Sequence, residues 1–230
     1  MPPLSKTPFK TAVWAIVKKD LLIELNTRQS ISIMVMFSLA SIIMFNFALE
    51  TNLAAARNVA TGLLWATILL AGTLGLNRTI GIEQENQAID TLLIAPIDRH
   101  VIYVAKTIST MIFTAVLEII LVFAFTIFFN KPFLQPSILL IIFLGTIGYI
   151  GAGVLITSMT IQTRARDILL PVVLLPVTLP LILPVSIATA EFMTGQPEIA
   201  RVQTAVSIAA AYDIIIISVG LLVYRFVIES

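Results

Sequence analysis

The sequence predicts an all-α, polytopic membrane protein with six transmembrane helices and an N-terminal interfacial amphipathic helix. Three observations predict this class. Of the 230 residues, 58% are apolar and only 12% are charged, whereas a soluble domain carries about 25% charged residues. The mean hydropathy is +1.02. Apolar runs long enough to cross a bilayer, which takes about 20 residues per helix, alternate with short polar connections.

The composition also excludes several kinds of site. A net charge of +1 provides no basic surface for nucleic acid. The chain has no cysteine and a single histidine, His100, which excludes thiolate chemistry and a His-based metal cluster. It contains neither GxxxxGKS nor GxxxxGKT, so it cannot hold ATP in a P-loop. Since no catalytic dyad or nucleophile–base pair emerges either, we expect a non-catalytic protein without a metal site.

Residues 11–26 predict a helix that lies on the membrane rather than across it. One stripe of this helix is apolar at spacings of three and four residues, and four charged residues break the apolar run. The stripe consists of Trp14, Val17, Leu21 and Leu25, and the charged residues are Lys18, Lys19, Asp20 and Glu24. Two placements fit: in the interface with Trp14 at the level of the headgroups, or packed on the protein's own cytoplasmic face.

Six apolar runs predict the transmembrane helices. They cover residues 30–49, 59–77, 102–129, 137–161, 168–190 and 205–228. In the fourth run, Gly145, Gly148 and Gly151 are three residues apart, with Gly153 just beyond. Such a surface of small residues lets another helix approach closely, so we expect this span to pack against its neighbours.

The positive charges predict the orientation of the spans. With a cytoplasmic N-terminus, eleven lysines and arginines lie inside, and three (Arg57, Lys131 and Arg201) lie outside. Both termini are therefore expected in the cytoplasm. Residues 1–29 would form a cytoplasmic N-terminus with the amphipathic helix, and residues 30–230 would form the six-helix transmembrane domain.

The fifth span has an unusual composition, because Pro171, Pro176, Pro180 and Pro184 each remove a backbone donor and disturb the preceding turn. In lipid, the backbone carbonyls that lose their hydrogen-bond donors must find partners on neighbouring helices, on side chains or in a water-lined cavity. The span is therefore either a kinked helix buried in protein or a flexible, partly unwound element beside a path.

Two acidic residues, Glu118 and Asp213, lie inside predicted spans. Their distances from the span ends at Phe129 and Ala205 are ~16 Å and ~12 Å along a helix, so both fall at a similar depth in the outer half of the bilayer. A charge facing lipid is expensive, so we expect both side chains to face the protein interior. Two roles are open for each acid. It is protonated or hydrogen-bonded to a neighbouring group and has no further role, or it places a polar group on a substrate path or at a contact between helices.

The longest polar connection runs from Arg78 to Lys106 and joins the second and third spans. Residues 83–96 are expected to form a short helix within it, with acidic residues near its start, an apolar face at helical spacing and a proline that favours its end. The candidate contact residues are Glu83, Glu85, Ile89, Asp90, Leu92, Leu93 and Pro96. The alternative is a solvated loop whose charges merely hold it in water.

Four stretches of the sequence resemble a known family. They are WAIVKKDLLIELNTRQS before the first span, GLLWATILLAGTLGLNR in the second, EQENQAIDTLLIAPIDR in the acidic connection and LLPVTLPLILPVSI in the fifth span. In this order and spacing, over essentially the whole chain, they resemble the heme exporter protein B (CcmB) family. One departure is Gln87, where the family usually has Gly, and it alters a turn or helix start that needs the glycine.

The resemblance implies a permease subunit of an ABC-type complex for cytochrome c maturation in the bacterial cytoplasmic (inner) membrane. The implied partners are an ATP-binding subunit (CcmA), the membrane subunits CcmC and CcmD, and the haem chaperone CcmE, with two copies of this chain by analogy with ABC transporters. ATP hydrolysis by the partner would release the haem-loaded chaperone, with haem as candidate cargo and no firmly bound cofactor. Residues 78–101 would be the coupling segment that meets the ATP-binding subunit.

Two other functions fit the same layout. The chain could be the permease of another ABC exporter that moves lipid, drug or polysaccharide, or a membrane scaffold without a transport path.

Overall fold

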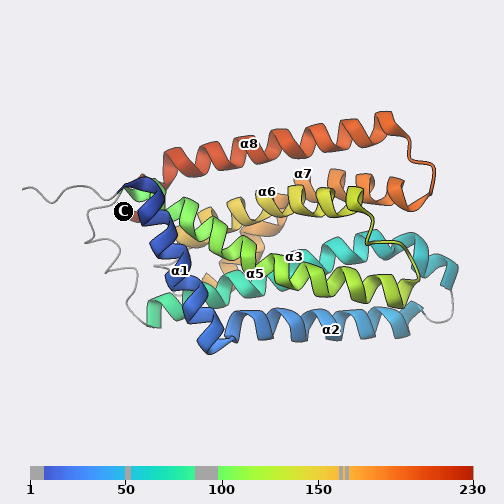
Figure 1. The fold of residues 1–230 in the computed structure, drawn as a ribbon, viewed down its shortest axis with the longest axis horizontal. Helices are drawn as coiled ribbons and strands as arrows, with labels where there is room; N and C mark the ends of the chain where they lie inside the picture. Colours follow the sequence, from blue (N-terminus) through green and yellow to red (C-terminus); the bar gives the residue numbers. More distant parts are fainter. Residues whose placement is uncertain (1–7, 50–52, 86–97, 161–162, 164–165, 230) are drawn as a thin grey trace, which may run out of the picture.

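The computed structural model of the chain describes residues 8–49, 53–85, 98–160, 163 and 166–229. All regular structure within these ranges is helical and forms seven helices (Figure 1). They are α1 (Phe9–Thr27), α2 (Gln29–Leu49), α3 (Leu53–Glu85), α5 (Arg99–Phe129), α6 (Pro136–Thr160), α7 (Arg166–Met193) and α8 (Ile199–Glu229). The predicted all-α class is confirmed.

Six of these helices are long and apolar enough to cross a membrane. The candidate spans are Gln29–Leu49, Val59–Thr79, Arg99–Phe129, Pro136–Thr160, Ile168–Met193 and Ile199–Phe226. All six predicted spans are therefore found. The largest difference is at the last one, which begins at Ile199 rather than at residue 205.

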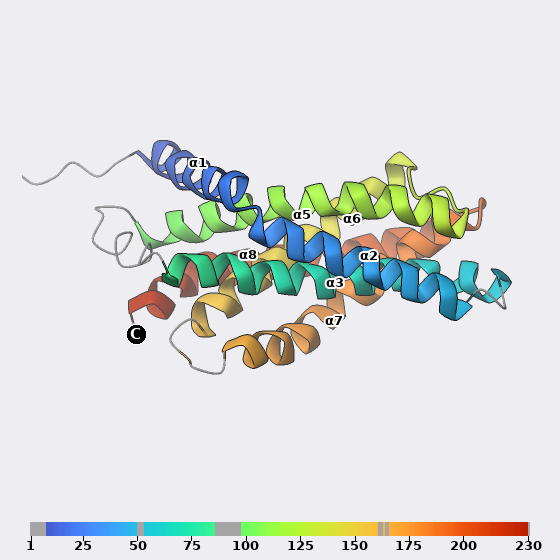
Figure 2. The ribbon, with the colours of Figure 1, turned by 90° about the horizontal axis from the view of Figure 1, so that it is seen from below.

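The six long helices form one elongated bundle, and α1 lies obliquely across one end of it (Figures 1 and 2). We call this the α1 end and the opposite one the far end. The last residues of α3, α6 and α8 and the first residues of α5 and α7 lie at the α1 end. The segments that the charge pattern places in the cytoplasm thus share one end of the molecule, which is what the predicted topology requires.

The centre of the bundle is α6, which contacts α3, α5, α7 and α8. Its glycines receive large side chains from these neighbours. The contacts are Trp65 over Gly145, Leu181 and Tyr212 over Gly148, Ile217 and Tyr103 over Gly151, and Leu76 over Gly153. A Cβ atom at any of these glycines would collide with its neighbour, so the predicted role of the small residues in close packing is confirmed.

Hydrogen bonds hold three of the large side chains in place. The Trp65 indole donates to Thr189 Oγ1 of α7 at 3.1 Å. The Tyr149 hydroxyl of α6 donates to the Leu69 carbonyl of α3 at 3.1 Å, and the Tyr103 hydroxyl of α5 donates to the Gly151 carbonyl at 3.1 Å. Each bond gives a buried polar side chain a partner on another helix, so each joins two helices.

The proline-rich helix α7 is helical throughout, from Arg166 to Met193. Pro176 and Pro180 lie on its exposed face, whereas Leu174 and Leu181 are fully buried on the opposite face. The structure therefore shows no unwound segment in α7, and Pro171 and Pro184 are half-buried. Figure 2 shows the first part of α7 standing away from the other helices. Whether this helix flexes during function stays a prediction.

The packing of Trp65 on α6 generates a first prediction. Gly145→Leu should destabilise the protein by about 1–3 kcal/mol, because its side chain meets a buried ring that a hydrogen bond holds in place. Gly62→Leu is the matched control, since a Cβ at Gly62 has no heavy atom within 4 Å. The thermal unfolding temperature of both variants in detergent measures the effect. An equal change for both would contradict this account of α6.

Candidate functional site

The helix α1 packs on α5 with a face that includes two acids. Its buried residues are Ala12, Ile16, Val17, Asp20 and Glu24. Of the predicted apolar stripe, Val17 is buried, whereas Trp14 and Leu25 are both 65% exposed. The two acids can be buried because both have partners inside the protein. Packing on the protein's own surface is confirmed, and it leaves Trp14 exposed on the opposite face.

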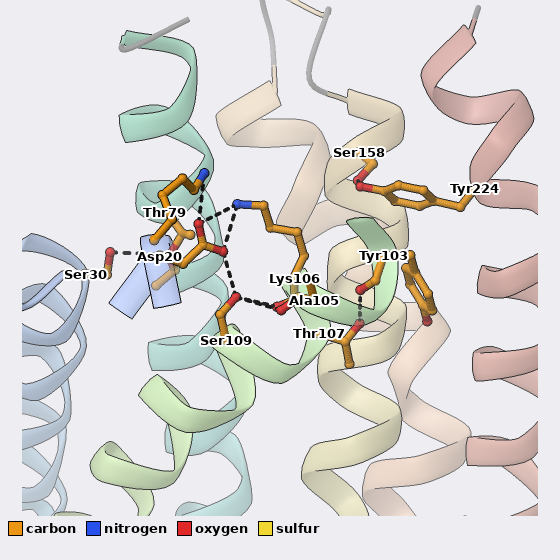
Figure 3. A network of polar contacts seen from close by, with 12 residues as sticks. Asp20, Ser30, Thr79, Tyr103, Ala105, Lys106, Thr107, Ser109, Ser158 and Tyr224 are labelled. Carbon is orange, nitrogen blue, oxygen red and sulfur yellow. Dashed lines mark hydrogen bonds and ion pairs between the residues drawn. The ribbon is translucent and has the colours of Figure 1, made fainter. Parts of the chain in front are cut away.

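A buried ion pair joins α1 to α5. Lys106 Nζ lies 3.1 and 3.0 Å from the two carboxylate oxygens of Asp20, and the Ser109 hydroxyl donates to the same carboxylate at 2.9 Å (Figure 3). Lys19 Nζ lies 3.1 Å from Asp20 Oδ1. Asp20 and Lys106 are only 5% and 7% exposed. Burial of such charges is tolerated when they are paired and hydrogen-bonded, as they are here.

The second buried acid of α1 caps the next helix. Glu24 is 3% exposed, and its Oε1 accepts a hydrogen bond from the Ile31 backbone N–H at 2.8 Å. Ile31 lies in the first turn of α2, where N–H groups lack helical partners and negative charge is favourable. Between the two helices, Arg28 adopts a left-handed conformation with φ 53° and donates its N–H to the Glu24 carbonyl. The angle between α1 and α2 is therefore held at two points.

Two further contacts join α2 to the end of the second span. Arg78 Nε donates to Gln29 Oε1 at 2.8 Å, and the Thr79 hydroxyl donates to Ser30 Oγ at 3.4 Å. Together these groups fasten α1, α2, α3 and α5 to one another at the α1 end. We call the set the α1-end network; its residues are Asp20, Glu24, Gln29, Ser30, Arg78, Thr79, Lys106 and Ser109.

The structure describes part of the predicted docking segment. Glu83 and Glu85 lie in α3 and prolong the second span, so the prediction that these two acids belong to the start of a separate helix was wrong. The stretch TIGIEQE after Arg78 contains no proline to stop α3, and the two acids do not lie at a helix start. The remaining residues of the segment, Ile89, Asp90, Leu92, Leu93 and Pro96, fall outside the described residues.

Both intramembrane acids face the protein, as predicted. Glu118 is 7% exposed and bonds with the Thr146 hydroxyl of α6. Asp213 is 6% exposed and lies against Gly148 of α6. Because Thr146 and Gly148 are two residues apart, the acids flank α6 at one level. Among the described residues, neither carboxyl oxygen of Asp213 has a hydrogen-bond partner.

Sequence reasoning missed the ion pair of Asp20 with Lys106. The available signal was that each charge interrupts an apolar run, Asp20 in the N-terminal helix and Lys106 near the start of the third span. Nothing in the spacing could join them, because 86 residues separate the two positions. The described residues hold no group of three or more His, Cys, Asp or Glu side chains that could bind a metal ion. The α1-end network consists of hydrogen bonds and an ion pair that join four helices.

The comparison with protein families decides the identity. The family model described as CcmB protein matches residues 11–227, which is nearly the whole chain. The chain belongs to the CcmB family. No curated protein matches it in a sequence comparison.

Membership in the CcmB family gives the chain a role. CcmB proteins are permease subunits of an ABC-type haem exporter of cytochrome c maturation, and they work with an ATP-binding partner. Family membership and the six apolar helices make this chain a multi-pass inner-membrane protein. The α1-end network includes Arg78 and Thr79, the first two residues of the segment 78–101 that is predicted to meet the ATP-binding partner.

The buried ion pair generates a second prediction. Lys106→Met leaves the Asp20 carboxylate buried with its main partner removed, which should destabilise the protein by about 3–5 kcal/mol. Asp20→Asn combined with Lys106→Met should restore much of that loss, since no charge then stays unpaired. Lys18→Met removes a charge from the exposed face of α1 and serves as the control. Thermal unfolding of the wild type, Asp20→Asn, Lys106→Met and the double variant completes the cycle, and additive effects of the two substitutions would contradict the pairing.

Proposed function

We propose that this CcmB protein converts ATP hydrolysis on the CcmA-like subunit into release of the haem-loaded CcmE-like chaperone. One observation carries the proposal: the helices on both sides of the coupling segment, residues 78–101, are fastened to the N-terminal helices. Arg78 and Thr79 bond with Gln29 and Ser30 of α2. At the other end, α5 begins at Arg99 and is paired through Lys106 with Asp20 of α1.

This arrangement supports the transmission of force. A displacement of the coupling segment acts on α3 and α5 at once, because it connects them directly. Through the α1-end network it also acts on α1 and α2, whose relative angle is held by the Glu24 cap. A displacement would therefore reach all four of these helices. Small sliding of packed helices is a known mode of conformational change.

The docking surface of the proposal is the acidic and apolar part of the coupling segment. Glu83, Glu85 and Asp90 would meet basic groups on the ATP-binding subunit and set its orientation, while Ile89, Leu92 and Leu93 would supply most of the contact energy. Trp14 and Leu25 of α1 are exposed at the same end of the bundle. They extend the apolar surface that this end offers to a partner or to the membrane.

The proposed assembly has two copies of this chain and includes CcmC-like and CcmD-like membrane subunits. ATP is bound by the partner subunit alone, and haem is the cargo of the complex without being a firmly bound cofactor of this chain. Both termini and the coupling segment lie in the cytoplasm. The gathering of α1, the end of α8 and the ends of the coupling segment at one end of the bundle supports this topology.

A third prediction concerns docking. Glu85→Lys with Asp90→Lys, and separately Leu92→Asp with Leu93→Asp, should leave membrane insertion intact because the segment lies outside the spans. Both double variants should lose the ATP-binding subunit on gentle purification and fail to support haem release. Glu198→Lys, an exposed charge reversal at the far end, should retain the subunit. Retention by both double variants would move the docking surface elsewhere, most plausibly to α1.

A fourth prediction concerns topology, and the absence of cysteine from the sequence makes it simple to test. Single substitutions Asn58→Cys, Glu85→Cys, Gln135→Cys, Gln196→Cys and Ser230→Cys each introduce one thiol for an impermeant reagent. In intact cells the cysteines at 58, 135 and 196 should react, and those at 85 and 230 should react after lysis alone. Labelling of Glu85→Cys from outside would refute the cytoplasmic coupling segment.

A further inference from the structure

A lateral pocket opens between α5 and α6 toward the far end of the bundle. Its volume is about 230 Å³. Its floor consists of the buried side chains Glu118, Val122 and Ile142, and its rim includes the exposed side chains Ile119, Phe123 and Phe143. Since the rim residues belong to membrane-spanning helices, the mouth faces the lipid or another membrane protein.

The pocket is apolar except for one carboxyl group on its floor. Glu118 is 7% exposed, and among the described residues its hydrogen-bond partner is the Thr146 hydroxyl. That hydroxyl also lies 2.8 Å from the Ile142 carbonyl, so its single proton is shared between two acceptors. A carboxylate can accept up to about four hydrogen bonds, and the pocket is the side from which a further donor can reach it.

The size and depth of the pocket restrict its occupant. A volume of about 230 Å³ is below the range of ~300–1,000 Å³ typical of small-molecule sites, but it accommodates one large side chain. Glu118 lies eleven residues before the end of α5 at Phe129, or ~16 Å along the helix. Lipid headgroups stay at the membrane surface, and lipid tails carry no hydrogen-bond donor.

We propose that the pocket receives a lysine, arginine or tryptophan side chain from a transmembrane helix of a different membrane protein. Such a side chain has an apolar stem that fits the walls and a donor at its tip that reaches Glu118. A pairing of this kind removes the cost of the acid within the membrane. Close approach of the partner helix would cover the rim residues Ile119, Phe123 and Phe143.

The chemistry of this chain favours a different protein over a second copy. Among the described residues of its spans, Trp65 is fully buried and Lys106 is paired with Asp20. The arginines of these spans with described side chains, Arg78, Arg99, Arg201 and Arg225, lie near the span ends. A second copy therefore offers no suitable donor at the depth of Glu118 from this part of the chain.

Photocrosslinking in cells that contain the whole complex tests the proposal. The photoreactive analogue p-benzoylphenylalanine replaces Phe123 or Phe143 at the rim, or Phe47 on the exposed face of α2 as the control. The two rim probes should form an adduct with one membrane protein. Mass spectrometry should map it to a transmembrane segment that carries Lys, Arg or Trp at matching depth, and the Phe47 probe should not form it.

Variants of the pocket complete the test. Glu118→Leu should lower the yield of the rim adduct at least about tenfold. Ile119→Trp fills the mouth and should lower it similarly without touching the acid, whereas Ile120→Trp on the same helix, outside the pocket, should leave it unchanged. Adducts with lipid alone, with a second copy, or with a helix that lacks such a side chain would overturn the proposal. An adduct that neither Glu118→Leu nor Ile119→Trp reduces would overturn it as well.

Discussion

Close approach of side chains to the α6 backbone is the constraint on which the rest of the bundle depends. Lipid tails are as apolar as leucine, so helices in a membrane associate through packing and hydrogen bonds rather than through the hydrophobic effect. Each of the four helices around α6 places a large side chain over one of its glycines. The reverse contact also occurs, because Tyr149 of α6 lies over Gly72 of α3. The bundle is therefore interlocked at its centre, and motion is easier at its periphery.

The features that the sequence predicts well are those that depend on the composition and spacing of residues within one segment of the chain. Length and apolar composition specify the six spans, since a bilayer demands a run of about 20 residues whatever the tertiary fold. The glycine spacing of α6 indicates close packing for the same reason, because small residues in a span have few other uses. The inward direction of Glu118 and Asp213 follows from the cost of charge in lipid alone.

The features that were missed depend on contacts between distant residues. Apolar spacing on α1 favoured a face with Trp14 and Leu25, yet Asp20 and Glu24 turn inward because Lys106 and the first turn of α2 satisfy them. The extension of α3 through Glu85 shows the same limit, since acidic residues alone do not mark where a helix begins. The sequence therefore shows which charged residues are available for the candidate site, but which of them pair with one another is decided by the fold.

The separation of Asp20 from Lys106 has a consequence for biosynthesis. Asp20 leaves the ribosome long before Lys106, which follows it by 86 residues, and its carboxylate has no buried place until that lysine is available. The N-terminal helix must therefore wait at the membrane surface while two complete spans are synthesised and inserted. Although α1 is the first helix to be made, it can reach its final position only after the third span begins to enter the bilayer.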